Sequence, residues 1–213
     1  MKAFIYTGGR IWPSHITEHP RGDDLVISAD SGYRNAGLMG EKTAVLVGDF
    51  DSLGEGNVPK DIPGSPEIVR LRPEKDFTDT QAAVDIALDR GADELVIIGG
   101  LSGRTDQALS NLAILEHLYL QGIRAIITDG CTRARYMRNS SELIGRSQYP
   151  YLSIICADEK LKGVSAEGVK YPLKNAVLTR TNQYAISNEI VENCALISVK
   201  KGGMWILETR DPD

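Results

Sequence analysis

Four short motifs in the first half of the chain carry residue types suited to metal and phosphate chemistry. In chain order they are Asp30-Ser31-Gly32, Gly48-Asp49-Phe50-Asp51-Ser52, Lys75-Asp76-Phe77-Thr78-Asp79 and Gly99-Gly100-Leu101-Ser102-Gly103-Arg104-Thr105-Asp106. Each follows a strand-like run or opens a helix-like one. Parallel strands end at one edge of an open sheet, and ligands bind in the crevice there. Motifs spread over residues 30–106 can therefore meet in one site.

Asp49 and Asp51 are the strongest indication of a bound cation. Side chains two residues apart in extended chain point to the same side. Two charges about 4 Å apart interact by roughly 4 kcal/mol at an effective dielectric constant near 20, so this pair repels, and Asp76 and Asp79 would add to the repulsion. Oxygen ligands with no His or Cys nearby favour Mg²⁺ over zinc. We therefore expect a magnesium site at this edge of the sheet.

Some of these acidic motifs could instead cap helices. Asp30 precedes one possible helix, and Thr78 and Asp79 stand at the start of another. Asp and Thr commonly occupy the N-cap position, where the side chain accepts a hydrogen bond from the helix backbone. The sequence leaves both roles open for each of these residues.

The glycine-rich loop around Gly100–Gly103 supplies groups that bind an anion. Glycines let the backbone approach a phosphate, and the helix expected after the loop directs its N-terminal amides toward one. Arg104 can donate two parallel hydrogen bonds to phosphate oxygens. Arg72 and Lys75 add positive charge, although both could equally be solvated. Beside an acidic metal site, this loop indicates a nucleotide polyphosphate.

The elements that must position these motifs alternate between strands and helices. Apolar runs predict strands covered on both faces, and periodic apolar residues predict helices over 79–90 and 106–121. This alternation, with short links, predicts a mostly parallel, doubly wound, Rossmann-like α/β domain. The expected strands are 3–6, 25–28, 44–47, 68–71, 94–98 and 125–128.

The second half of the chain has a different pattern, in which strand-like runs alternate with turns. Strand-like runs at 151–155, 176–179 and 195–199 are separated by Gly, Pro and Asn turns, and residues 200–207 are typical of a hairpin. No helix of ordinary length is expected there. We therefore expect an all-β sandwich, with domains at 1–132 and 133–213.

Composition excludes several classes of protein. The 213 residues include 29 acidic and 24 basic ones, for a net charge of −5, whereas nucleic-acid binding uses clustered Lys and Arg. No apolar run is long enough to span a membrane, and the run before Gly8 is too short for a signal peptide. The three cysteines have no metal-like spacing. We expect a cytoplasmic protein with neither nucleic-acid nor membrane partners.

With its motifs in this order, the chain resembles the thiamin pyrophosphokinase family. The resemblance continues with Gln107, Gly168–Leu173 and Ile186–Glu189, and it covers nearly the whole chain. It implies that ATP and thiamine react to give AMP and thiamine diphosphate, with the thiamine hydroxyl attacking the β-phosphorus of ATP. It also implies a homodimer whose thiamine sites lie between the first domain of one subunit and the second domain of the other.

The resemblance further implies roles for individual residues. Mg²⁺ would be held by Asp49, Asp51 and Asp76, which with Asp79 and Arg104 form the expected catalytic set. The residues expected to bind the nucleotide are Asp30, Ser31, Gly100, Ser102, Gly103, Arg104 and Asp106. In this set Asp106 would either fix Arg104 or cap its helix. Those expected to face thiamine are Gln107, Ser187, Asn188 and Trp205, although Trp205 could equally belong to the sandwich core.

Two other functions stay open at this stage. In a metal-dependent phosphohydrolase, Asp49 and Asp51 would activate water. In a non-catalytic nucleotide sensor, the second domain would recruit a partner and no chemistry would follow.

The substitution Asp51→Ala is expected to lower pyrophosphoryl transfer at least about 10³-fold, or roughly 4 kcal/mol in activation free energy, because it removes a metal ligand. Formation of AMP from ATP and thiamine in saturating Mg²⁺ measures the rate. Near-normal turnover under those conditions would contradict the assignment of Asp51 to the metal.

Overall fold

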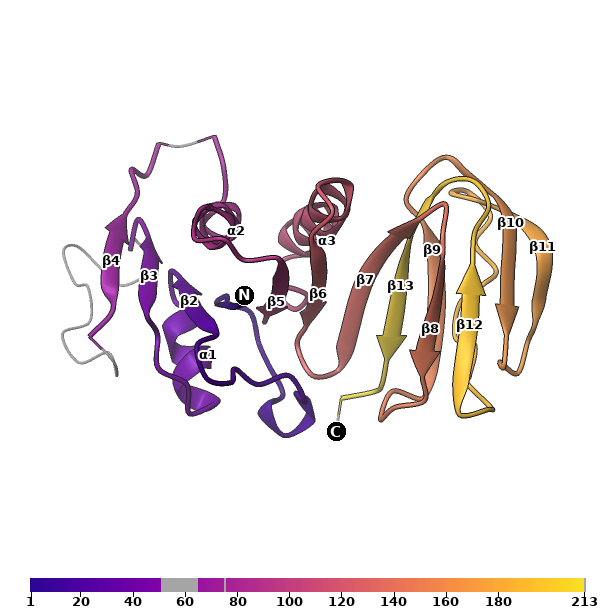
Figure 1. The fold of residues 1–213 in the computed structure, drawn as a ribbon, viewed down its shortest axis with the longest axis horizontal. Coiled ribbons are helices and arrows are strands. Elements are labelled where there is room, and N and C mark those ends of the chain that lie inside the picture. The colour runs from indigo at the N-terminus through magenta and orange to yellow at the C-terminus, as the bar shows by residue number, and fades with distance from the viewer. Residues whose placement is uncertain (51–64, 75, 213) are drawn as a thin grey trace. The chain divides into compact units, whose positions relative to one another are not determined.

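The structure is a computed structural model that describes residues 1–50, 65–74 and 76–212. The chain divides into two units, residues 1–130 and 131–213 (Figure 1). No helix among the described residues is both long and apolar enough to cross a membrane.

The described residues of the first unit form six parallel strands. Every neighbouring pair is parallel, and the spatial order is β4-β3-β2-β1-β5-β6. The strands are β1 (Lys2–Tyr6), β2 (Leu25–Ala29), β3 (Val45–Gly48), β4 (Glu67–Arg70), β5 (Glu94–Ile98) and β6 (Arg124–Thr128). All six strands expected from the sequence are confirmed.

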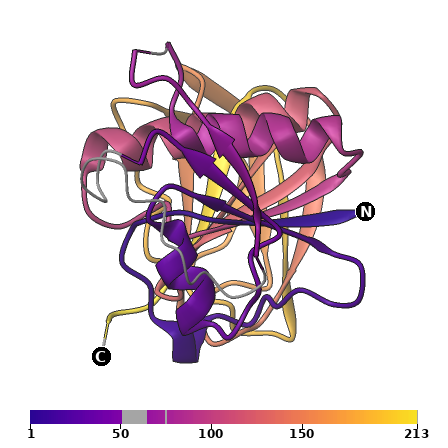
Figure 2. The same cartoon turned by 90° about the vertical axis from the view of Figure 1, so that its left-hand side faces the viewer.

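Helices cover both faces of these strands. The short helix α1 (Gly32–Leu38) lies on one face, and α2 (Asp79–Asp89) and α3 (Thr105–Leu120) lie on the other (Figure 2). A 3-10 turn, η1 (Pro13–His15), follows β1. Strands β1, β2, β3 and β5 bury nearly every residue, as two-sided cover requires. The sequence predicted α2 and α3 but not α1, which has only seven residues and a weak apolar pattern.

The order of the strands reverses between β1 and β5. From β1 the chain adds β2, β3 and β4 on one side, and it then places β5 and β6 on the other. The loops that leave two such strands diverge, so a crevice opens at their carboxyl ends. In this unit those loops begin at Thr7 and Gly99.

Two antiparallel sheets form the second unit, and its described residues contain no helix. In spatial order, one sheet consists of β7 (Thr132–Arg138), β13 (Gly203–Thr209) and β9 (Tyr151–Cys156). The other consists of β11 (Leu173–Thr179), β10 (Lys160–Glu167), β12 (Cys194–Ser198) and β8 (Ser141–Gly145). The all-β expectation for this half is confirmed.

The predicted hairpin over residues 200–207 is wrong. Strand β12 pairs with β10 and β8, whereas β13 pairs with β7 and β9, so the intervening turn leads from one sheet into the other. Gly202 has φ of +113°, and a Cβ there would lie 2.7 Å from a methyl carbon of Leu161. The glycines permit a close crossover past β10 rather than a two-strand turn.

A buried charge network joins the two sheets of the second unit. Glu208 on β13 is 1% exposed and accepts two hydrogen bonds from Arg133, at 2.9 and 2.7 Å, and one from Arg135, at 2.6 Å. Arg135 also donates to Glu142 on β8, in the other sheet, at 2.6 Å. Two positive and two negative groups therefore balance, and such pairing is what makes buried charge tolerable.

The substitution Glu208→Gln is expected to lower the free energy of unfolding by about 3–5 kcal/mol, because Arg133 and Arg135 lose the carboxylate that they share. Chemical denaturation measures the loss. Glu189→Gln is the matched control in the same unit, since it removes an exposed ion pair with Lys170 and should cost much less. Equal losses in the two variants would contradict a special role for the network.

Candidate active site

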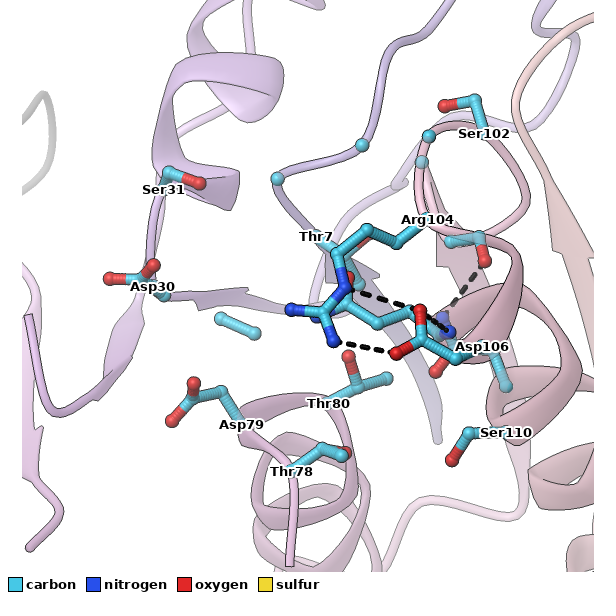
Figure 3. A pocket seen from close by; sticks show the side chains of 18 of the residues that line it. Thr7, Asp30, Ser31, Thr78, Asp79, Thr80, Ser102, Arg104, Asp106 and Ser110 are labelled. Carbon is cyan, nitrogen blue, oxygen red and sulfur yellow. Dashed lines mark hydrogen bonds and ion pairs between the residues drawn. The ribbon is translucent and has the colours of Figure 1, made fainter. Parts of the chain in front are cut away.

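A pocket of about 750 Å³ opens at the carboxyl ends of the parallel strands, around the reversal between β1 and β5 (Figure 3). Four parts of the first unit line it. They are residues 7–10 after β1, residues 29–31 at the end of β2, residues 73 and 77–80 around the start of α2, and residues from 99 to 111 between β5 and α3.

Three of the four sequence motifs contribute to this pocket. The predicted site residues that line it are Asp30, Ser31, Asp79, Gly100, Ser102, Gly103, Arg104, Asp106 and Gln107. They converge because each follows the end of a parallel strand or begins a helix at the same edge.

Of the proposed metal ligands, Asp49, Asp51 and Asp76, the structure describes only two. Asp49 and Asp76 are described but do not line the pocket, and Asp51 and Lys75 lie outside the described residues. Within residues 1–50, 65–74 and 76–212, no group of three or more His, Cys, Asp or Glu side chains is arranged to hold a metal ion. The set of three aspartates stays a prediction.

Asp30 is not a helix cap, so that interpretation of the sequence is wrong. The N-cap of α1 is Ser31, and its side chain makes no capping hydrogen bond. Asp30 has φ of +46°, a left-handed backbone that few residues other than glycine adopt. A Cβ on Gly48 would lie only 3.2 Å from the Asp30 Cα, so the ends of β2 and β3 pack closely here. Such strain at a pocket is typical of a functional position.

Thr78 is the residue that caps α2. Its hydroxyl accepts a hydrogen bond from the Gln81 N–H at 3.1 Å, which leaves Asp79 as the first helical residue.

Asp79 and Asp30 lie on one side of the pocket, and one carboxylate oxygen of each is shielded from solvent. Arg104 and Asp106 lie on the other side (Figure 3). One side of the pocket thus carries two carboxylates, and the other carries the Arg104–Asp106 ion pair.

Asp106 orients Arg104. The guanidinium donates to both carboxylate oxygens, at 2.6 and 3.1 Å, and Asp106 also accepts the Gln107 N–H at 3.0 Å. The Arg104 hydrogen bonds hold the pKa of the Asp106 carboxyl below its usual range, and they raise the pKa of Arg104. The ionised carboxylate of Asp106 therefore fixes the direction of the guanidinium.

Sequence reasoning missed the loop after β1 as part of the site. Residues 7–10 line the pocket beside the loop that begins at Gly99. A methyl group on Gly9 would overlap the carbonyl oxygen of Gly99, so the two loops touch backbone to backbone. The Gly8-Gly9 pair, one residue after the end of a buried strand, could have indicated this loop, since Gly99-Gly100 follows a buried strand in a similar way.

The residues expected to face thiamine in the second half belong to the second unit. Ser187 has φ of +56°, and its N–H donates to Ser153 at 3.0 Å. Asn188 is buried, and its amide holds the backbone of Tyr171 through hydrogen bonds of 2.9 and 2.8 Å. The Asn188 side chain therefore fixes the position of the Tyr171 backbone.

Trp205 lies on a different face of its sheet from the fully buried Met204 and Ile206, because neighbouring residues of a strand alternate in direction. The indole is half-buried, and its ring meets Tyr136 edge-on with the ring centroids 6.3 Å apart.

Two family models match the chain, one in each half. The model for "Thiamin pyrophosphokinase, catalytic domain" matches residues 19–127, and the model for "Thiamin pyrophosphokinase, vitamin B1 binding domain" matches residues 141–204. The first contains the acidic motifs and most of the pocket, and the second contains Ser187 and Asn188.

Individual proteins agree with these matches. Thiamine pyrophosphokinase of Bacillus subtilis (strain 168) is 28% identical over 165 residues, which is 77% of each chain. The crystal structure of thiamine pyrophosphokinase from Bacillus subtilis superposes with a TM-score of 0.86 at 25% identity and covers both chains fully. The thiamin pyrophosphokinase of Candida albicans, at 13% identity, shares the fold with a TM-score of 0.77 over 98% of this chain and 90% of its own.

Proposed function

Because this chain belongs to the thiamin pyrophosphokinase family, whose enzymes make thiamine diphosphate with ATP as substrate, we propose that its pocket binds ATP and transfers the pyrophosphoryl group to thiamine. The observation that carries the proposal is the division of the pocket. Two glycine loops and Arg104 offer groups for phosphate, and Asp30 and Asp79 face them from the other side.

The side of the pocket that carries Arg104 suits a polyphosphate. Helix α3 begins at Thr105, so its first amides and the positive end of its dipole lie beside the loop 99–104. Arg104 is exposed and pre-oriented by Asp106, so it can meet phosphate oxygens without losing much side-chain freedom. A Rossmann-like nucleotide site at the strand reversal is the arrangement that we propose.

The acidic side of the pocket suits Mg²⁺. Its donors are carboxylate oxygens, the ligands that Mg²⁺ prefers, and Asp30 and Asp79 each keep one oxygen away from solvent. From the family resemblance we propose Asp49, Asp51 and Asp76 as the ligands, although Asp49 and Asp76 do not line the described pocket and Asp51 lies outside the described residues. Asp79, which does line the pocket, would orient the metal's ligands or the thiamine hydroxyl. When bound, Mg²⁺ offsets the charge of the phosphate oxygens.

The residues of the chain act mainly by positioning. The thiamine hydroxyl attacks the β-phosphorus of ATP, the bond to the α-phosphate oxygen breaks, and AMP leaves. Phosphoryl-type transfer depends on alignment and electrostatic stabilisation. Arg104 and the loop backbones hold the phosphates in line for attack, so no nucleophile from the protein is required.

We propose that the enzyme is a homodimer in which Ser187, Asn188 and Trp205 of one subunit bind the thiamine that reacts in the pocket of the other, beside Gln107. A pair of exposed leucines in the second unit supports a partner. Leu143 on β8 and Leu196 on β12 stand opposite each other in register, and they are 66% and 38% exposed. Exposed apolar pairs of this kind favour a protein interface.

A cytoplasmic location fits the same proposal. The cysteines Cys131, Cys156 and Cys194 are all free thiols, which suits a reducing compartment. The ATP that the reaction consumes is made inside cells.

Incubation with Mg·ATP and thiamine is expected to give AMP and thiamine diphosphate in equal amounts. Chromatography of the products measures both, and omission of thiamine should stop AMP formation. ATP consumption that continues without thiamine would favour the phosphohydrolase, and tight ATP binding without AMP would favour the sensor. ADP with thiamine monophosphate would contradict transfer of a pyrophosphoryl group.

Two inactive variants should restore activity when their subunits are mixed. Arg104→Ala disables the pocket and Trp205→Ala the thiamine face, so an Arg104→Ala/Trp205→Ala heterodimer would keep one intact shared site of two. After refolding from an equal mixture, roughly a quarter of wild-type activity is expected, since half the dimers are mixed. No recovery in heterodimers isolated with two affinity tags would contradict shared sites.

A further inference from the structure

Asn35 on α1 holds the loop after β1 in place by two hydrogen bonds. Its side chain is 8% exposed, and its amide nitrogen donates to the carbonyl oxygens of Thr7 and Gly9, at 2.6 and 2.7 Å. Both acceptors are carbonyls, so the amide orientation is fixed by its partners. One NH₂ group therefore uses both of its hydrogens to hold the two ends of the turn Thr7–Gly9.

These two hydrogen bonds determine where the neighbouring N–H groups point. The described chain has no cis peptide bond, and in a trans peptide the C=O of one residue and the N–H of the next point in opposite directions. The Thr7 and Gly9 carbonyls face Asn35, so the N–H groups of Gly8 and Arg10 face away from it. Gly8 and Arg10 line the pocket, whereas Asn35 does not.

The two N–H groups are available to a ligand. Among the described residues, neither donates a hydrogen bond to another part of the chain. Backbone N–H groups that line a pocket and are not used within the chain can bind an anion. Gly9 packs against Gly99, and Ser102 donates to the Arg10 carbonyl at 2.7 Å, so this turn is fixed to the loop that leads to Arg104.

We propose that Asn35 is a positioning residue for the nucleotide: it turns the N–H groups of Gly8 and Arg10 into the pocket, where they bind phosphate oxygens of ATP. This inference rests on the proposed use of the pocket for ATP. Asn35 acts through the loop backbone and does not itself touch the ligand. Asparagine suits the position because Asp has no hydrogen to donate, and Ser has only one.

The variant Asn35→Asp keeps the shape of the side chain but removes both donors. It is expected to raise KM for ATP tenfold or more and to leave KM for thiamine within about twofold. The matched control is Thr43→Val, which breaks the buried hydrogen bond between Ser28 and Thr43 (2.8 Å). Thr43 precedes the amino end of β3, and neither Thr43 nor Ser28 lines the pocket. The control should lower Tm without changing KM for ATP.

A second measurement uses the native protein and does not depend on the folding of a variant. The Gly8 amide resonance should move on titration with a non-hydrolysable ATP analogue and stay in place with AMP, which lacks the β- and γ-phosphates. An Asn35→Asp variant with unchanged KM for ATP, or a Gly8 resonance that does not respond to the analogue, would overturn the proposal.

Arg104→Ala separates failure of this inference from failure of the proposed site. If Arg104→Ala weakens ATP binding and Asn35→Asp does not, only the role of Asn35 is overturned. If neither variant weakens ATP binding, the pocket is not the ATP site and the inference fails with it. Weakening by both variants, with the control unchanged, supports both.

Discussion

The contact between Gly9 and Gly99 is the constraint on which the site depends. Both loops leave the sheet where the strand order reverses, and they meet through backbone atoms alone because neither residue has a side chain. This close contact has an entropic cost, because glycine loses more conformational entropy on folding than other residues. In return, two sets of backbone donors lie at one edge of a rigid parallel sheet, and the long helix α3 begins a few residues beyond.

Two buried asparagines, one on α1 and one on α3, donate hydrogen bonds to the backbone of these loops. Asn35 on α1 binds carbonyls of the first loop, and Asn111 on α3 donates to the Gly100 carbonyl at 2.8 Å. The helices thus do more than cover the sheet. They fix peptide planes, and peptide planes decide whether a phosphate meets N–H groups or carbonyl oxygens. Rigid support of this kind lowers the entropic cost of ordering a site when its ligand binds.

Much of the fold could be predicted from the sequence because buried parallel strands leave continuous apolar runs. The strand that precedes Gly99 and the periodic pattern after Asp79 were both clear. Helix α1 was not, because a seven-residue helix relies on tertiary contacts more than on its own periodicity. The turn at Gly202 was misread, since a glycine pair marks close backbone approach whether the next strand pairs with the last one or crosses to another sheet.

The site was predictable in its residue types but not in all its contacts. Asp30 and Asp79 could each be read as a cap, and only the backbone geometry separated them from Ser31 and Thr78, which occupy the cap positions. The family resemblance left Asp106 either to hold Arg104 or to cap the helix, and the structure shows the hydrogen bonds to Arg104. No pattern of spacing could show that Asn188 would hold Tyr171. Such hydrogen bonds depend on side-chain direction, which the local sequence does not determine.

The crossover at Gly202 also bears on the order in which the second unit can assemble. Strand β13 lies between β7 and β9 and supplies the hydrogen bonds on one side of each, yet it follows both in the chain. During synthesis, β7 and β9 leave the ribosome well before their shared partner. Their open edges must stay unpaired with other chains until residues 203–209 emerge, so the stretch of translation just before β13 is when this unit is most exposed to aggregation.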